Sequence, residues 1–204
     1  MRLFLSILFL PVFFVGCATV PHGDFCAKNL HRPSYFAQGE KRAAFRVNVQ
    51  AKGYSFDGIL QLKQVDDTSY EAVLFLTAGA YQVLRATVTR DTITYHFLTK
   101  SADRAFVRKK LNTLFHLLLF AEQGTFTCRE KEQIRYLTST EKGTVRYAYE
   151  RGEQNPYEVS ARRMFHTSRL SFAGYGPEGE SVLPHQLTYQ DGPVVASLQL
   201  LLLR

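Results

Sequence analysis

The sequence predicts a mainly β protein of the α+β class, with roughly ten or eleven antiparallel strands and one main helix. Most of the chain after residue 43 alternates apolar and polar residues with a period of two, which is typical of half-buried strands. A single segment repeats apolar residues at helical spacing instead. Turn-forming stretches separate the alternating segments at intervals of about 8–12 residues, which favours strands joined in a meander.

Five alternating segments come first along the chain. In the earliest of them Phe45, Val47 and Val49 alternate with polar neighbours, so these three side chains are predicted to share one buried face. Each segment is followed by a short stretch of turn-forming residues, which predicts an antiparallel pairing of neighbours. The five predicted strands are Ala44–Ala51, Tyr54–Val65, Tyr70–Leu76, Tyr81–Thr89 and Thr92–Leu98.

The helical segment is predicted over Ala102–Glu122, with Ser101 as its N-cap and its end before Gly124. Its second half is apolar on nearly every side, so it is expected to be a plug buried in the core or a lid over an apolar cavity. The residues predicted to form this lid are Leu111, Leu114, Phe115 and Leu118.

The first half of the same helix is strongly basic, with Arg104, Arg108, Lys109 and Lys110. Two interpretations remain open for these side chains. They could meet lipid phosphates, or they could form an ordinary solvated helix face.

Strands resume after the helix and continue to the end of the sequence. No internal repeat and no low-complexity segment interrupts them. The predicted strands are Gln133–Thr138, Thr144–Glu150, Tyr157–Arg162, Leu170–Tyr175, Gln186–Gln190 and Val194–Arg204.

The first 16 residues have the pattern of a secretory leader, in which Arg2 precedes an apolar run that is too short to span a membrane. The stretch Phe14-Val15-Gly16-Cys17 resembles the lipobox of bacterial lipoproteins. That resemblance implies that Cys17 carries a diacylglyceryl group and that its freed amine is acylated, for example with palmitate. Because Ala18, and not Asp, follows the cysteine, the same resemblance implies an outer-membrane anchor that faces the periplasm.

The predicted organisation is therefore a leader at residues 1–16, a lipidated N-terminus and tether at 17–42, and one β domain at 43–204. The formal net charge of +7 favours acidic partners, and the abundant ones in the cell envelope are anionic lipid head groups, not nucleic acid. Cys26 and Cys128 could form a disulfide in an oxidising periplasm, or they could remain two buried thiols.

Three short stretches carry a resemblance to a known superfamily. They are Phe56-Asp57-Gly58-Ile59-Leu60, Leu74-Phe75-Leu76-Thr77, and Leu183-Pro184-His185-Gln186-Leu187-Thr188-Tyr189, which a turn and a last strand follow. Together with the leader and the helical insertion, they make the chain resemble the LolA/LolB superfamily. The resemblance implies an open half-barrel whose concave apolar face is covered by helical segments.

The function implied by this resemblance is that of an acceptor or carrier of lipids or lipoproteins, supplied by a periplasmic carrier. LolB has a projecting loop with an exposed leucine, whereas the matching stretch Thr77-Ala78-Gly79-Ala80-Tyr81 is short and has none. The chain therefore resembles a LolB-like outer-membrane lipoprotein of a separate branch and not LolB itself.

An apolar inner wall of the sheet is the predicted cargo-binding surface, because large aromatic and aliphatic side chains suit flexible acyl chains. The alternative is that the helix fills the concavity, which would make the chain a structural or envelope-assembly lipoprotein without cargo. The predicted cargo-binding residues are Phe45, Val47, Phe56, Leu60, Leu74, Leu76, Tyr95, Phe97, Tyr147, Tyr149 and Phe172.

No motif predicts an enzyme, a cofactor or a metal site. The six histidines show no spacing typical of zinc ligands. Gly174-Tyr175-Gly176-Pro177-Glu178-Gly179 has the spacing of a dinucleotide-binding motif, but Pro177 and Pro184 follow where that motif needs a helix. An esterase is the third alternative, and the chain has no G-x-S-x-G elbow for one.

Overall fold

The computed structural model describes residues 30, 32–33, 35–36, 41–51, 54–78, 81–121, 125–140, 144–163, 166–175 and 183–203. Within these ranges the chain forms twelve strands and one α-helix. The predicted leader, Cys17 and Cys26 lie outside the described residues.

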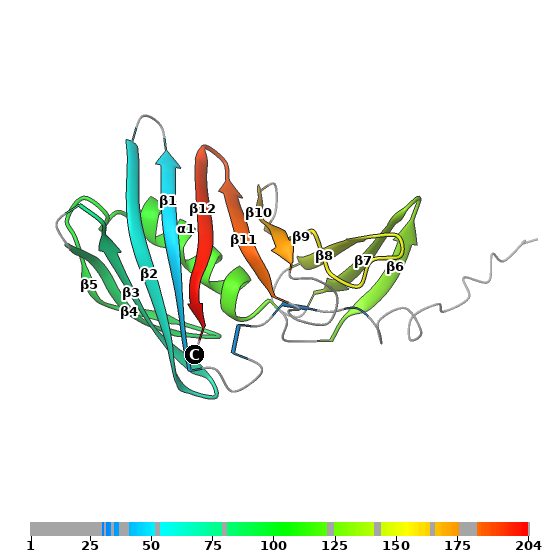
Figure 1. Ribbon diagram of the computed structural model, residues 1–204, viewed down its shortest axis with the longest axis horizontal. Coiled ribbons are helices and arrows are strands. Elements are labelled where there is room, and N and C mark those ends of the chain that lie inside the picture. Colours follow the sequence, from blue (N-terminus) through cyan, green and yellow to red (C-terminus); the bar gives the residue numbers. More distant parts are fainter. Residues whose placement is uncertain are drawn as a thin grey trace, which may run out of the picture.

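All twelve strands belong to one antiparallel sheet that does not close into a barrel (Figure 1). Their order across the sheet is β5-β4-β3-β2-β1-β12-β11-β10-β9-β8-β7-β6, so the first and last strands pair at its centre. The strands of the first half are β1 (Arg42–Ala51), β2 (Tyr54–Asp66), β3 (Ser69–Leu76), β4 (Gln82–Thr89) and β5 (Ile93–Leu98). Those of the second half are β6 (Thr127–Lys131), β7 (Ile134–Ser139), β8 (Thr144–Glu150), β9 (Glu158–Arg163), β10 (His166–Tyr175), β11 (Pro184–Asp191) and β12 (Val194–Leu203).

This strand order explains the course of the helix α1 (Ala105–Leu119). Because α1 connects the edge strand β5 to the opposite edge strand β6, it has to cross the face of the sheet. In Figure 1 it lies on one side of the sheet, behind β1, β2 and β12, and the sheet curves around it. The mainly β, open architecture with one main helix is thus as predicted.

Alternation within each strand places the core on the face that α1 covers. Phe45 of β1, for example, pairs with Leu60 of β2 and Leu200 of β12, and Phe45 and Leu60 are both buried. Gly58 of β2 allows an unusually close backbone approach, since a Cβ atom there would lie 2.4 Å from the Phe75 carbonyl oxygen.

Strand β6 is the element that the sequence did not predict. Only Cys128 is buried in it, and the other four residues are exposed. It is also a sheet edge, paired on one side with β7. A short edge strand with one buried side chain has no apolar alternation to reveal it.

The helix is shorter than predicted, and the predicted N-cap at Ser101 is wrong. Arg104 precedes the first helical residue with an extended backbone (φ −123°, ψ 142°), and no side chain caps the helix there. Ser101 lies in a turn held by the backbone bonds from Ala102 and Asp103 to the Thr99 carbonyl. At the other end the Phe120 N–H donates to the His116 carbonyl at 3.0 Å and closes the last turn.

Part of the range predicted as a tether belongs to the folded domain. Leu30, Tyr35 and Phe36 are buried in the core cluster. The Tyr35 ring meets the Phe45 ring edge-on with centroids 5.1 Å apart, and its hydroxyl donates to the Pro184 carbonyl at 2.7 Å. Leu30, Tyr35 and Phe36 therefore help to cover the same face of the sheet as α1.

Candidate functional site: an apolar pocket beneath the first half of helix α1

An apolar pocket lies between the first half of α1 and the sheet. Its cavity volume is about 190 Å³. Its walls come from strands β1 to β5, β11 and β12, from the helix, and from Ala102, which precedes the helix. The lining residues are Val49, Ala51, Phe56, Leu74, Val83, Leu84, Leu98, Ala102, Phe106, Val107, Lys110, Leu111, Leu114, Tyr189, Val194 and Ala196.

The volume limits what this pocket can hold. An apolar cavity of about 150 Å³ in another protein holds one benzene molecule, and typical ligand pockets measure about 300–1,000 Å³. In this conformation the pocket therefore fits a segment of one acyl chain and not a complete lipid.

The structure brings two of the predicted cargo-binding residues, Phe56 and Leu74, into the pocket wall. Phe45, Val47 and Leu60 are buried in the core and do not line the pocket. Leu76, Tyr95 and Phe172 are half-buried outside it. Tyr147 and Tyr149 lie in the other half of the sheet, where both are buried.

Phe97 is on the wrong side of the sheet for the predicted wall. A β-bulge between β4 and β5 pairs Ala86 with Tyr95 and Arg85 with Phe97. The extra residue, His96, breaks the alternation, because a bulge shifts every later side chain to the opposite face. Phe97 is consequently 44% exposed, whereas Leu98 turns inward and lines the pocket.

The predicted lid residues divide between two environments. Leu111 and Leu114 line the pocket. Phe115 and Leu118 are almost completely buried in the packed core, at 1% and 3% exposure. The cavity is thus beneath the first half of α1, whereas the sequence pattern predicted the lid in the apolar second half.

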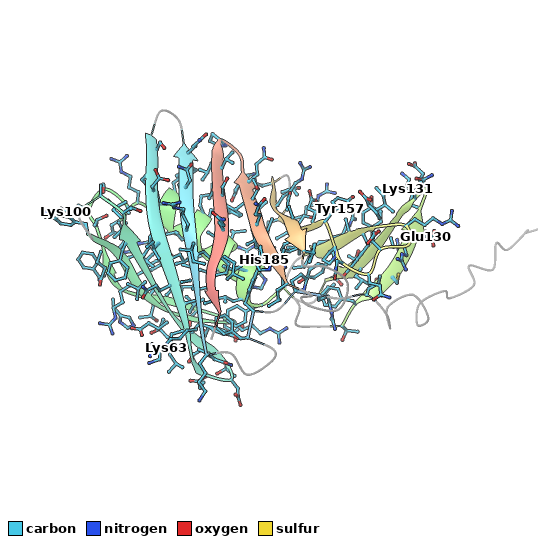
Figure 2. The ribbon with its side chains drawn as sticks, in the orientation of Figure 1. Lys63, Lys100, Glu130, Lys131, Tyr157 and His185 are labelled. Carbon is cyan, nitrogen blue, oxygen red and sulfur yellow. The ribbon has the colours of Figure 1, made fainter. Side chains whose placement is uncertain are left out.

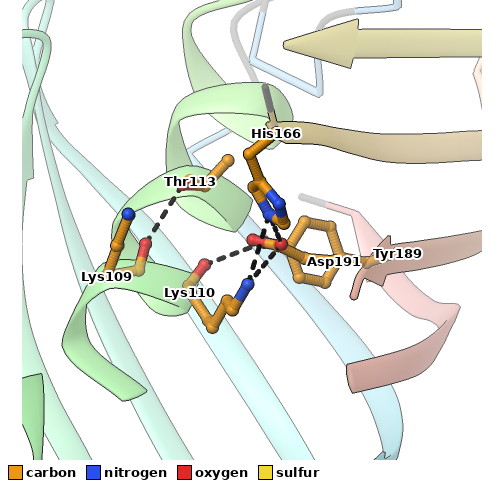
Figure 3. Close-up of polar contacts among 6 residues, drawn as sticks. All are labelled: Lys109, Lys110, Thr113, His166, Tyr189 and Asp191. Carbon is orange, nitrogen blue, oxygen red and sulfur yellow. Dashed lines mark hydrogen bonds and ion pairs between the residues drawn. The ribbon is translucent and has the colours of Figure 1, made fainter. Parts of the chain in front are cut away.

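A buried polar cluster adjoins the pocket, where it joins α1 to β10 and β11 (Figure 3). Asp191, only 2% exposed, pairs through Oδ1 with both the Lys110 ammonium and His166 Nε2. The Tyr189 hydroxyl lies 2.9 Å from Asp191 Oδ2 and 3.2 Å from the Lys110 carbonyl oxygen. Lys110 and Tyr189 also line the pocket, so the cluster forms its polar corner.

The charge of this cluster follows from its contacts. Burial by itself raises the pKa of Asp191, but hydrogen bonds from Lys110, His166, Tyr189 and Ser168 lower it below its usual value. Burial, with the neighbouring Asp191 carboxylate, raises the pKa of Tyr189 and keeps its hydroxyl protonated. The corner therefore holds a carboxylate that is matched by a lysine, with a neutral phenol beside it.

Sequence reasoning did not select Lys110 and Tyr189 as pocket residues. Lys110 stands in a run of basic residues that looks solvent-exposed, yet it is buried and pairs with Asp191, 81 positions later in the sequence. The alternating pattern of β11 did contain a signal, since Leu187, Tyr189 and Asp191 all lie on its buried face.

Beneath the second half of α1 the concave face is largely filled by aromatic side chains, and a pocket of about 280 Å³ borders this region next to His116 and Phe120. The Phe36, Tyr70 and Phe120 rings form a chain of contacts with centroids 4.9 and 5.4 Å apart. The Arg32 guanidinium lies 4.9 Å from the centroid of the Phe126 ring, which in turn meets Tyr147. Arg32, Phe36 and the end of α1 thus fill most of this region.

Cys128 is disulfide-bonded, and its partner lies outside the described residues. The pairing of Cys128 with Cys26 and the lipidation of Cys17 stay predictions. In the part of the chain that the structure describes, no helix is long and apolar enough to cross a membrane.

Among the described residues, no group of three or more His, Cys, Asp or Glu side chains is arranged to hold a metal ion. The predictions that the chain needs no metal or cofactor and that it is not an enzyme remain predictions.

Comparison with known proteins yields similarity in structure only. No family model matches the chain, and no curated protein matches it. A LolA superfamily protein from Nitrosomonas europaea is similar in structure, with a TM-score of 0.56 and 10% identity over 83% of this chain and 87% of the other. A DUF1329 family protein from Desulfovibrio piger has a TM-score of 0.52 and 8% identity over the same shares of the two chains.

An outer membrane lipoprotein-sorting protein domain from Vibrio parahaemolyticus aligns with a TM-score of 0.45 and 10% identity, over 81% of this chain and 85% of that one. The first likeness, to the LolA superfamily protein, shows that the chain has a LolA/LolB-like fold. The resemblance seen in the sequence is confirmed at the level of the fold.

Proposed function

We propose that this chain, whose fold is LolA/LolB-like, is an outer-membrane-anchored periplasmic lipoprotein that binds an acyl chain of lipid or lipoprotein cargo beneath helix α1. The observation that carries the proposal is the pocket itself. Apart from Lys110 and Tyr189 at one corner, every side chain that lines it is apolar. A cavity with such walls excludes water and favours hydrocarbon.

The way into the pocket also supports this function. Phe106 lines the pocket and is 53% exposed, so the cavity reaches the surface at the first turn of α1. An acyl chain could enter there end-first, with its polar head group remaining outside. Longer chains would require α1 to move away from the sheet.

The location rests on the leader and the lipobox-like stretch that ends at Cys17. An acylated N-terminus would keep the domain at the membrane surface, because each buried methylene contributes about 0.8 kcal/mol to anchoring. The proposal also includes a donor protein that delivers the cargo. No contact surface for that donor is assigned among the described residues.

A fluorescent fatty acid tests the proposal on the non-lipidated mature chain, which comprises residues 17–204 with Cys17→Ala and retains all described residues. The expected result is saturable binding that Ala196→Phe weakens at least tenfold, because Ala196 lines the cavity and the new ring would occupy it. Ser197→Phe is the matched control, since its side chain lies on the opposite, exposed face of β12.

Two outcomes would contradict acyl-chain binding. One is the absence of saturable binding by the non-lipidated mature chain, which would favour the alternative of a structural lipoprotein without cargo. The other is an equal loss of binding in Ala196→Phe and Ser197→Phe. Mass spectrometry of the N-terminus of the natural protein tests the anchor separately.

A further inference from the structure

The rim of the pocket carries an exposed aromatic side chain next to several cations. Phe106 projects from the first turn of α1 at the pocket opening. Lys100, Arg104 and Lys109 are exposed, and all three lie with Phe106 within the ten residues that enter and begin the helix. These four residues are called the α1 rim below.

The charge of the α1 rim is not balanced by neighbouring acids. Arg108 is paired with Asp103, with 2.6 Å between its Nη2 and Oδ1, and Lys110 is paired with Asp191. Lys100, Arg104 and Lys109 have no ion pair with any residue in the described part of the chain. Asp103 is the one acidic residue between positions 99 and 110.

The position of these cations is unfavourable for the helix. The N-terminus of an α-helix carries a partial positive charge, which acidic side chains stabilise and basic ones oppose. The first turn of α1 nevertheless has no acidic residue, and its N-cap position is occupied by Arg104 without a side-chain cap. Local rules of this kind are typically broken where a function requires it.

We infer that the α1 rim docks on the surface of an anionic phospholipid bilayer. Exposed aromatic rings combined with lysine and arginine are typical of protein surfaces that bind at the bilayer interface. The cations would meet lipid phosphates, while Phe106 would enter the head-group layer. The opening of the pocket would then face the bilayer, so that an acyl chain need not cross water.

This orientation gives the proposed acyl-chain site a direct route to membrane lipid, and in that respect it rests on the proposed function. The docking itself does not depend on cargo. A surface of this kind predicts binding to negatively charged vesicles even when the pocket is blocked.

The test measures sedimentation of the non-lipidated mature chain with vesicles of phosphatidylcholine alone or mixed with phosphatidylglycerol. Binding is expected only to the anionic vesicles, and it should weaken in high salt. Each basic residue near an anionic surface contributes about fivefold to binding, so reversing all three charges with Lys100→Glu, Arg104→Glu and Lys109→Glu should reduce it at least about hundredfold.

A matched control reverses three exposed charges elsewhere, with Lys63→Glu, Arg129→Glu and Lys131→Glu. Figure 2 shows Lys63 and Lys131 far from Lys100, which lies at the edge formed by β5. The control should change vesicle binding less than threefold. Thermal unfolding checks that the rim variant is folded. It is expected to fold, because acidic residues at the start of α1 should favour the helix.

Two results would overturn the inference. The first is equal binding of the unmodified chain to neutral and anionic vesicles. The second is an equal loss of vesicle binding in the rim and control variants, since such a loss would reflect net charge alone. Ala196→Phe should dock normally, and the rim variant should still bind fluorescent fatty acid. Failure of cargo binding and failure of docking are thereby separable.

Discussion

The two halves of helix α1 cover the same sheet in different ways. Its first half, up to Leu111, lies over a cavity of about 190 Å³ and has an exposed phenylalanine at its start, next to cations that form no ion pair with a described residue. Its second half, from Thr113 on, is buried on almost every side. The first half of this one helix thus borders a cavity, whereas its second half is part of the packed core.

The difference arises from what else covers the sheet beneath each half of the helix. Beneath the second half, the rings of Phe36, Tyr70 and Phe120 interlock, and Tyr35 packs on Phe45. Beneath the first half, the helix alone faces the strands among the described residues, and the smaller side chains of Ala51, Ala102 and Ala196 line the gap. The cavity remains where the helix alone covers the curved sheet, without the additional side chains that Tyr35 and Phe36 supply elsewhere.

The largest expected effect is a loss of stability caused by a substitution in the packed second half of α1. Phe115→Ala should cost about 3–5 kcal/mol of unfolding free energy, because it opens a new cavity in a close-packed core. Leu111→Ala should cost less than half as much, since its side chain already borders the hollow and is half-buried. Urea unfolding of both variants provides the measurement, and equal losses would contradict the distinction between the two halves.

The next effect concerns the polar cluster at the boundary between the halves. Asp191→Asn should destabilise the fold by about 3 kcal/mol, because it leaves the buried Lys110 ammonium without its carboxylate. Asp103→Asn, which breaks the solvent-exposed pair with Arg108, should cost less than about 1 kcal/mol. Similar losses in the two variants would argue against a special role of the buried pair.

The same cluster predicts a dependence of stability on pH. Since the pKa of Asp191 is lower in the folded chain than its usual value, the carboxylate stabilises the fold above the unfolded pKa of about 3.9. This contribution is lost as the pH falls through the folded pKa. The unmodified chain should therefore lose more unfolding free energy between pH 5 and pH 3 than Asp191→Asn does, and parallel curves would contradict the prediction.

The smallest effect is expected at Tyr35, which packs on the face of the sheet that α1 covers. Tyr35→Phe removes the hydrogen bond to the Pro184 carbonyl and should cost about 1 kcal/mol. Fatty-acid binding should stay within twofold of the unmodified chain, because Tyr35 does not line the pocket. A large change in binding would show that the two halves are coupled.

Periodicity in the sequence was enough to locate eleven strands and the one helix, since buried and exposed residues alternate in nearly every element. It failed where that signal is absent or interrupted. β6 buries one residue, and the bulge at His96 moves Phe97 to the outer face. The basic run from Arg104 to Lys110 gave no sign that Lys110 is buried, because its partner is distant in the sequence.

The sequence by itself determined the class of the fold, the single crossing helix, and the apolar character of the face that the helix covers. These features depend on local patterning, which one chain segment expresses alone. Only the tertiary structure decided which part of that face stays open. The pairing of β1 with β12, the burial of Tyr35 and Phe36, and the meeting of Lys110 with Asp191 each join residues far apart in the chain. A cavity is the space such contacts leave unfilled, so no single segment of the sequence contains it.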